Sequence, residues 1–279
     1  MKAGASTAKT QPQHTNGAIS QAYETRLGTM FVGKVEEALE APALTQLRGK
    51  VNLILTSPPF PLVTKKQYGN ETGETYINWL ASLAPRLVEL LAEDGSIVLE
   101  IGNAWVKSLP VMSTLPLEAL LTFKKAADLH LCQQIICHNP ARLPGPAAWV
   151  NVKRVRLKDS FTHVWWMSRS PTPKADNRRV LTPYSSDMRK LLKTQRYNAG
   201  RRPSGHVISE RGFLNDHGGA IAPNVIDLDP IFHAPHYACA RGVSLNTDAP
   251  ETENLRDQVG ASAYRQGRCL RSANGSGCS

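Results

Sequence analysis

The chain has 279 residues, 41% of them hydrophobic, which is enough to bury a sizeable core in one large domain or two modest ones. Its formal net charge is +10, and its five cysteines form no CxxC pair, which argues against a disulfide framework or a zinc ribbon. No stretch approaches the roughly 20 apolar residues of a membrane span, and the polar N-terminus lacks the core of a signal peptide. We therefore expect a cytoplasmic protein.

Residues 1–20 are polar and aperiodic, and we predict that they are disordered. A short strand, a helix over Val35–Gln46 and a strand over Val51–Leu55 follow, an order typical of a parallel α/β unit. The next segment spaces its large apolar residues at helical intervals and ends at Asp94-Gly95, and the apolar run "SIVLEIG" predicts another buried strand.

A helix near Leu115–Ala127 leads to the predicted strands "LHLCQQIICHN" and "SFTHVWWMSRS". Alternating strands and helices predict an open doubly wound sheet, in which ligands bind beyond the carboxyl ends of the strands. The first of these strands contains His130, Cys132, Cys137 and His138, which could form a metal site. Their apolar neighbours favour a strand and its exit, and we predict no metal.

The basic residues concentrate in one segment. From Asn151 to Arg211 there are 15 Lys plus Arg against 4 Asp plus Glu, a net of +11, which leaves −1 for the rest of the chain. This is the electrostatic pattern of a surface that binds a polyanion, although a solvated basic face would give the same count. Between Pro171 and Pro223 the chain is also rich in Gly and Pro. A linker is possible there, but the recurring Arg and Lys favour an irregular DNA-reading insertion.

The tetrapeptide Ser57-Pro58-Pro59-Phe60 ends a predicted buried strand. It has the parts needed to methylate an exocyclic amino group of a base, whose nitrogen is a poor nucleophile. The Ser57 hydroxyl and the Pro58 carbonyl can accept hydrogen bonds from that group, and the prolines hold the carbonyl in place. Phe60 can stack on a base flipped out of a duplex. The alternative is a plain Pro-Pro turn, and the position at the carboxyl edge of a sheet favours the functional interpretation.

Several long blocks around this tetrapeptide resemble the N(4)-cytosine DNA methyltransferases of PvuII-type restriction-modification systems. They lie between Arg26 and Leu228 and include "LTSPPFPLVTKKQYGN", "DGSIVLEIGNAW", "NPARLPGPAAWVNVKRVRLKDSFTHVWWMSRS" and "RRPSGHVISERGFLNDHGGAIAPNVIDL". The resemblance implies a Rossmann-like fold that uses S-adenosylmethionine, with an incomplete doubly wound sheet and an irregular basic target-recognition segment. It also implies duplex DNA as the partner, and a restriction endonuclease that acts on the same site without direct binding; we expect neither a membrane nor a metal.

The resemblance assigns roles to particular residues. It implies a catalytic loop at Ser57, Pro58, Pro59 and Phe60, with Thr56 and Ser57 beside the cofactor. The implied DNA-binding residues are Lys65, Lys66, Arg154, Arg156, Lys158, Arg201, Arg202, Ser204 and His206. Arginine suits guanine in the major groove, and phosphate contacts by Lys and Arg give salt-dependent affinity. Lys65 and Lys66 could equally be solvated lysines, and each residue of the recognition segment could equally have a structural role.

The first position of the motif is serine and not aspartate, which favours cytosine over adenine and leaves an N(6)-adenine enzyme open. A 5-carbon methyltransferase is disfavoured, because it needs a cysteine nucleophile in a Pro-Cys context, and Cys132 and Cys137 have no such neighbours. The expected organisation is a disordered N-terminus (1–20), a catalytic half (21–170), a target-recognition segment (171–233) and a disordered tail outside the family (234–279).

The chain departs from the family in two places. Lys34 stands where the family commonly has aspartate, and the half that holds the cofactor is not recognisable after Leu228. A frameshift in the gene is one hypothesis, since permitted codons for Gln266–Ser272 include a set whose shifted frame reads KGDVFDP. Three interpretations remain: an active methyltransferase, a non-catalytic DNA-binding remnant, and a fragment completed by another chain.

Overall fold

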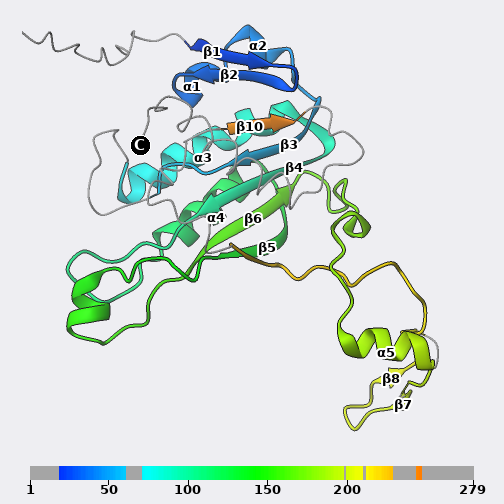
Figure 1. Ribbon diagram of the computed structural model, residues 1–279. Coiled ribbons are helices and arrows are strands. Elements are labelled where there is room, and N and C mark those ends of the chain that lie inside the picture. Colours follow the sequence, from blue (N-terminus) through cyan, green and yellow to red (C-terminus); the bar gives the residue numbers. More distant parts are fainter. Residues whose placement is uncertain (1–18, 61–70, 198, 210–211, 229–242, 247–279) are drawn as a thin grey trace, which may run out of the picture.

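A computed structural model describes residues 19–60, 71–197, 199–209, 212–228 and 243–246. Its centre is a six-stranded sheet with strand order β10-β3-β4-β6-β5-β9 (Figure 1). The strands are β3 (Val51–Thr56), β4 (Leu91–Ile101), β5 (His130–His138), β6 (Phe161–Ser168), β9 (Val225–Asp227) and β10 (Val243–Asn246). The hairpin β1 (Ser20–Thr25) and β2 (Gly28–Val32) lies beside this sheet (Figure 1).

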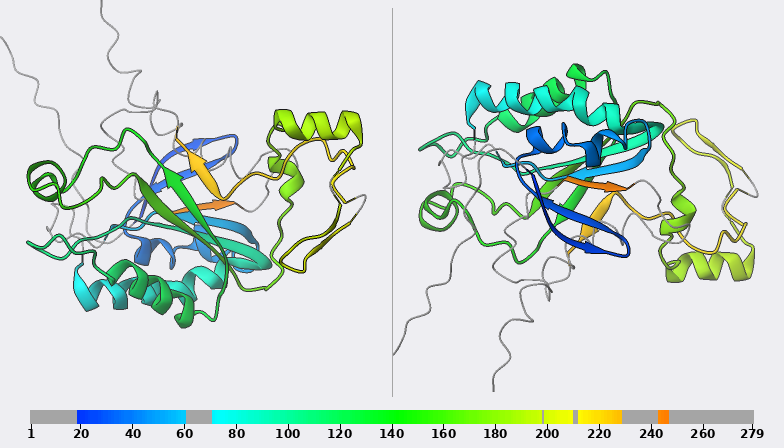
Figure 2. Two further views of the ribbon diagram at one scale, coloured as in Figure 1. Left: turned by 90° about the horizontal axis from the view of Figure 1, so that it is seen from below. Right: turned by 90° about the horizontal axis from the view of Figure 1, so that it is seen from above.

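Two long helices, α3 (Gly73–Leu90) and α4 (Leu115–Ala126), lie together on one face of the sheet (Figure 2). The helical spacing of the apolar residues in α3 buries Tyr76, Leu80, Leu83 and Leu87 against that face. The strand residues that pack against these helices alternate with residues of the other face of the sheet. They are at most 1% exposed, and they are Ile97, Leu99, Ile101 and Met167. This cluster is the main core of the protein.

The opposite face of the sheet carries a smaller cluster of Val98, Cys137 and Val164, with Leu53, Leu55, Ile135, Trp166 and Ile226 partly buried around it. Its strands obey the same alternation, since Val98 lies between Ile97 and Leu99 of the first face. Helices α3 and α4 do not cover this side (Figure 2). The two faces of the sheet are therefore packed unequally in the part of the chain that the structure describes.

The sheet is mixed, which differs from the parallel order expected from the alternation of helices and strands. Strand β3 runs parallel to β4, but β6 lies between β4 and β5 and is antiparallel to both. The chain reaches this position through the excursion 139–160, which contains the π-helix Ala148–Val152 but no α-helix that crosses the sheet, so β6 returns antiparallel to β5. The α/β methyltransferase-like class is retained, and β3, β4 and β5 still point the same way.

Three local predictions change. The helix expected over Val35–Gln46 is two short helices, α1 (Val35–Ala38) and α2 (Pro42–Thr45), because Pro42 has no backbone N–H for a continuing helix and instead starts α2. Helix α3 ends at Leu90, before Asp94-Gly95, because Leu91 is extended and pairs with Val51. Strand β10 pairs with β3 in the tail that was expected to be disordered, and Ser20 already belongs to β1.

The part of the basic segment that follows β6 forms a lobe that projects away from the sheet (Figure 1). It contains the 3-10 helix Asn177–Val180, helix α5 (Ser186–Thr194) and the short strands β7 (Gly200–Arg201) and β8 (Val207–Ile208). Ser185 caps α5 by accepting a hydrogen bond from the Met188 amide at 3.2 Å. The chain enters the lobe after Ser168 of β6, which pairs with Ser96 and His130 toward the amino ends of β4 and β5. It returns to the sheet at β9, which pairs with the carboxyl end of β5.

Candidate active site

The predicted catalytic loop begins where β3 ends. Val51 and Ile54 are fully buried in the sheet, Thr56 is 8% exposed, and Pro58 is buried, while Ser57, Pro59 and Phe60 are half-buried. Thr56 pairs with Leu99 of the parallel strand β4, so the loop leaves the sheet beside the last residues of β4. This is the carboxyl edge at which ligands bind in open α/β sheets.

The Phe60 ring packs on Gly102, the residue that follows β4. A Cβ atom at position 102 would lie 2.7 Å from Cε2 and 2.9 Å from Cδ2 of that ring. Because such distances are too short for real carbon contacts, the ring occupies the space that only glycine leaves open. Sequence reasoning missed Gly102 as a site residue, although it lies in the block "DGSIVLEIGNAW" that carried the resemblance.

A carboxylate lies at the same edge. Glu100 is half-buried and accepts a hydrogen bond of 3.0 Å from the Thr162 hydroxyl of β6. Burial and then the charge of Glu100 raise the pKa of Cys137 to about 11. A buried thiol with so high a pKa is a poor nucleophile, which agrees with the absence of a role for Cys137 in the predicted chemistry.

A series of hydrogen bonds between polar side chains begins at Asn103, two residues after the end of β4. The Gln134 amide donates to Nδ1 of His163 at 2.7 Å, so the ring proton sits on Nε2, which lies 3.1 Å from Oδ1 of Asn103. Asn103 Nδ2 in turn donates to Asp159 Oδ1 at 3.4 Å. Burial lowers the pKa of His163, and the charge of Asp159 opposes this shift. The neutral His163 ring is also stacked on the Trp165 ring, with 5.3 Å between the two ring centroids. In this position it holds Asn103 in place.

The predicted DNA-binding residues of the 139–160 excursion between β5 and β6 differ in their surroundings. The Arg156 guanidinium lies over the Trp105 ring, 2.8 Å from its centroid, and its Nη1 is buried without a hydrogen-bond partner. Lys158 is exposed, but its Nζ donates to the Pro140 carbonyl at 2.7 Å. Arg154 is exposed and has a positive φ of 53°. Among the three, Arg154 has the side chain best placed for a phosphate.

The other predicted DNA-binding residues lie far from the catalytic loop. Three of them are exposed: Arg201 at the end of β7, and Ser204 and His206 in the turn between β7 and β8. Arg202 is half-buried. A hydrogen bond of 2.8 Å from the Arg202 amide to the His206 carbonyl closes this turn. The structure places them in the projecting lobe and not beside Phe60 (Figure 1). Lys65 and Lys66 lie outside the described residues.

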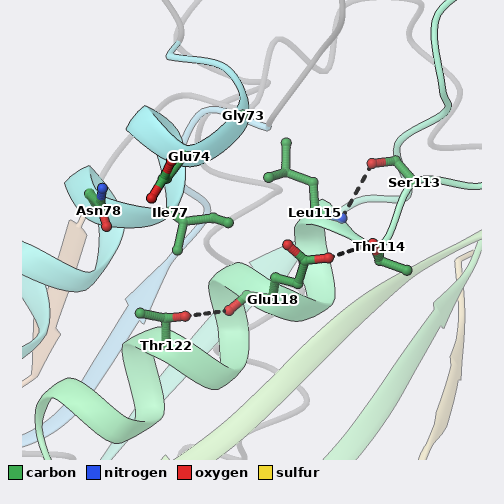
Figure 3. Close-up of a pocket in the computed structure, with 9 residues that line it drawn as sticks. All are labelled: Gly73, Glu74, Ile77, Asn78, Ser113, Thr114, Leu115, Glu118 and Thr122. Carbon is green, nitrogen blue, oxygen red and sulfur yellow. Dashed lines mark hydrogen bonds between the residues drawn. The ribbon is translucent and has the colours of Figure 1, made fainter.

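A separate pocket of about 670 Å³ lies between the N-terminal ends of α3 and α4 (Figure 3). Glu74 and Glu118 face it from the two helices, and Thr114 Oγ1 donates to Glu118 Oε1 at 2.5 Å. None of the predicted site residues that the structure describes lines it. In the described ranges, no cluster of three or more His, Cys, Asp or Glu residues is placed to hold a metal, and no helix is long and apolar enough to cross a membrane.

Comparison with known proteins supports the resemblance. Residues 51–213 match the DNA methylase family model. The chain is 37% identical over 209 residues to the type II methyltransferase M.PvuII of Proteus hauseri, covering 74% of this chain and 61% of that protein. It is also similar to the solved structure of the cytosine-N4-specific PvuII DNA methyltransferase, with a TM-score of 0.53, 30% identity, and coverage of 75% of this chain and 59% of the other.

The structural match confirms the predicted methyltransferase-like α/β fold. The chain spans about three-fifths of the length of the relative that it matches. More than half of its residues fall within the family model, including the catalytic loop and most of the basic segment. The chain belongs to the DNA methylase family.

Proposed function

We propose that this chain carries the base-binding part of a site-specific methyltransferase that modifies the 4-amino group of cytosine in duplex DNA. The observation that carries the proposal is the packing of Phe60 on Gly102, which brings the Ser57–Phe60 loop to the carboxyl edge of β4 in a DNA methylase. Its relatives are named as a type II methyltransferase and as a cytosine-N4-specific enzyme. Restriction-modification in the cytoplasm, with an endonuclease that cuts the same sequence, is part of this proposal.

The loop would act by positioning the base. Ser57 Oγ and the Pro58 carbonyl accept hydrogen bonds from the amino protons, which localises the nitrogen lone pair, while Phe60 stacks on the ring. Thr56, the last residue of β3, is paired with Leu99, and paired residues of neighbouring strands lie about 5 Å apart. Ser57 and Glu100 are the residues that directly follow this pair, so the loop leaves the sheet beside Glu100. Glu100 is therefore the carboxylate best placed to receive the proton that the amino group releases.

S-adenosylmethionine is the proposed cofactor and supplies the methyl group when bound. Thr56 and Ser57 would lie beside it, as the resemblance implies. A cradle for the cofactor also requires a parallel strand with a glycine-rich turn next to the catalytic strand. In the described residues the strand at that position is β10, which is short and antiparallel to β3. These residues fit the acceptor side of the reaction and do not supply the cradle.

The division of the chain is also proposed here. We infer a catalytic half (21–170), which contains β3 to β6, and a target-recognition segment (171–233), which contains the projecting lobe of Figure 1 and also β9 of the sheet. The lobe supplies Arg201, Arg202, Ser204 and His206, and the 139–160 excursion supplies Arg154, for contacts to DNA. A target site that touches both would have to extend from the catalytic edge to the lobe.

The test is methyl transfer from labelled S-adenosylmethionine to duplex DNA, with the modified nucleoside identified by mass spectrometry. Because the described residues do not supply a cofactor cradle, we expect methyl transfer by this chain to be slow, with N(4)-methylcytosine as its product and a loss of about 100-fold or more with Ser57→Ala at unchanged duplex affinity. Ser82→Ala, which removes an exposed hydroxyl on α3, is the control. N(6)-methyladenine as the product would overturn the assignment of the base.

A second candidate is a DNA-binding protein that transfers no methyl group. The observation that favours it is the antiparallel β10 at the side of β3 where a cofactor strand would lie. Duplex binding with no methyl transfer and no S-adenosylmethionine binding by calorimetry would support this candidate over the first.

A further inference from the structure

The return limb of the 139–160 excursion displays an apolar side chain to solvent. Leu157 is 90% exposed, the largest exposure among the large hydrophobic residues that the structure describes. The residues on either side are anchored. Arg156 is stacked on Trp105, and Lys158 donates to the Pro140 carbonyl at 2.7 Å. Leu157 is therefore held outward by its neighbours.

Those anchors place Leu157 beside the catalytic loop. Asp159 accepts from Asn103 at 3.4 Å, and Arg156 lies over Trp105, so the limb is attached twice to the segment that follows Gly102. The Phe60 ring packs on Gly102 itself. A base stacked on Phe60 and a side chain at position 157 would thus be neighbours along one edge of the sheet.

The side chains around Leu157 suit a ligand that is anionic on its outside and apolar within. Residues 140–158 contain no Asp or Glu, and exposed aliphatic side chains alternate with cations: Val152 is 77% and Val155 60% exposed, with Lys153, Arg154 and Arg156 between and beside them. Duplex DNA has phosphates outside and stacked bases within. An anionic lipid surface shares this chemistry, but only DNA accounts for the position next to a base-binding loop.

We propose that Leu157 is a wedge that enters the base stack of duplex DNA and fills the gap left by the flipped base. Removal of a base from the stack leaves apolar faces open, and apolar side chains inserted between base steps are a known way to stabilise such a distortion. The nearby Arg154 holds the backbone on which the wedge acts. This inference rests on the proposed function, because it needs a base to be flipped toward Phe60.

The test uses the full chain and a duplex that it selects from a random pool, with pyrrolocytosine placed at each cytosine in turn. We expect a fluorescence rise at the target position that falls about fivefold or more with Leu157→Ser and stays within about twofold with Leu157→Met. Leu27→Ser is the matched control, because Leu27 is 60% exposed in the turn between β1 and β2. Thermal unfolding establishes that each variant is folded.

An equal fluorescence rise for wild type and Leu157→Ser, with duplex binding intact, would overturn the wedge and leave the proposed function standing. Loss of binding by Leu157→Ser to all duplexes, selected or not, would also overturn it, because it would show a docking contact. Tighter binding to phosphatidylglycerol vesicles than to duplex, lost in Leu157→Ser, would assign the limb to a membrane surface. Failure of the wild type to bind any duplex would overturn both proposals.

Discussion

Phe60 and Gly102 meet in van der Waals contact across the carboxyl ends of β3 and β4. The contact is so close that a Cβ at position 102 would come within 2.7 Å of the Phe60 ring. It joins two segments that lie 42 residues apart in the sequence, and it sets where an aromatic ring stands at this edge of the sheet.

Replacement of Gly102 by alanine should push the Phe60 ring out of its place. We expect a loss of about 1–3 kcal/mol in the free energy of unfolding, as for other overpacked sites, together with weaker target-base binding. Thermal or denaturant unfolding measures the first effect and pyrrolocytosine fluorescence the second. The double variant Gly102→Ala with Phe60→Leu should recover stability but not base stacking. No recovery would show that the clash is with some other group.

Arg154 and Arg156 should respond differently to substitution. Arg154 is exposed, so Arg154→Ala should reduce the slope of log affinity against log salt by about one contact, roughly 0.9. The Arg156 guanidinium lies on Trp105, so Arg156→Ala should leave the slope nearly unchanged and lower the free energy of unfolding by about 1 kcal/mol. Salt titrations of duplex affinity and thermal unfolding separate the two outcomes. Equal slopes for both variants would contradict the placement of these side chains.

The stability of the fold should depend on pH through His163. Burial lowers the pKa of its ring in the folded protein below the usual histidine value of 6.5, so the folded state binds a proton less readily than the unfolded chain. The stability that the uncharged His163 ring contributes to the fold is therefore fully present above about pH 6.5, and it is lost as the pH falls toward the folded pKa. His163→Phe keeps the ring on Trp165 and removes the titration. We expect the wild type to lose more melting temperature than this variant between pH 8 and pH 5; parallel losses would contradict the prediction.

Removal of the Thr162 hydroxyl should affect the carboxylate at the candidate site. Thr162→Val keeps the shape of the side chain and deletes the donor 3.0 Å from Glu100 Oε1. Hydrogen bonds to charged groups contribute about 1.5–3 kcal/mol, so we expect a loss of that order at most and a fall in methyl transfer. Thr162→Ser, which retains the hydroxyl, should preserve most of both. A variant without either effect would remove Glu100 from the proposed chemistry.

The order of helices and strands was readable from the sequence where apolar patterns are long. The intervals of Tyr76, Leu80, Leu83 and Leu87 predicted α3, and the continuous apolar run of β4 predicted a buried strand. Short or interrupted elements were harder. Pro42 broke the first expected helix, and α5 lies in a basic segment whose apolar residues are too few for a clear period.

The sequence by itself determined the family and predicted the catalytic loop, because Ser57-Pro58-Pro59-Phe60 is one contiguous stretch whose residue types suit base binding and whose neighbouring blocks resemble DNA methylases. Only the tertiary structure decided which distant residues join that loop. Glu100 and Gly102 belong to the end of β4, and Thr162 and His163 belong to β6. The order and register of these strands are set by long-range pairing that no local pattern encodes. Long-range pairing also made β6 antiparallel to its neighbours. Tertiary contacts likewise decided that Arg156 stacks on Trp105 and that Leu157 is exposed.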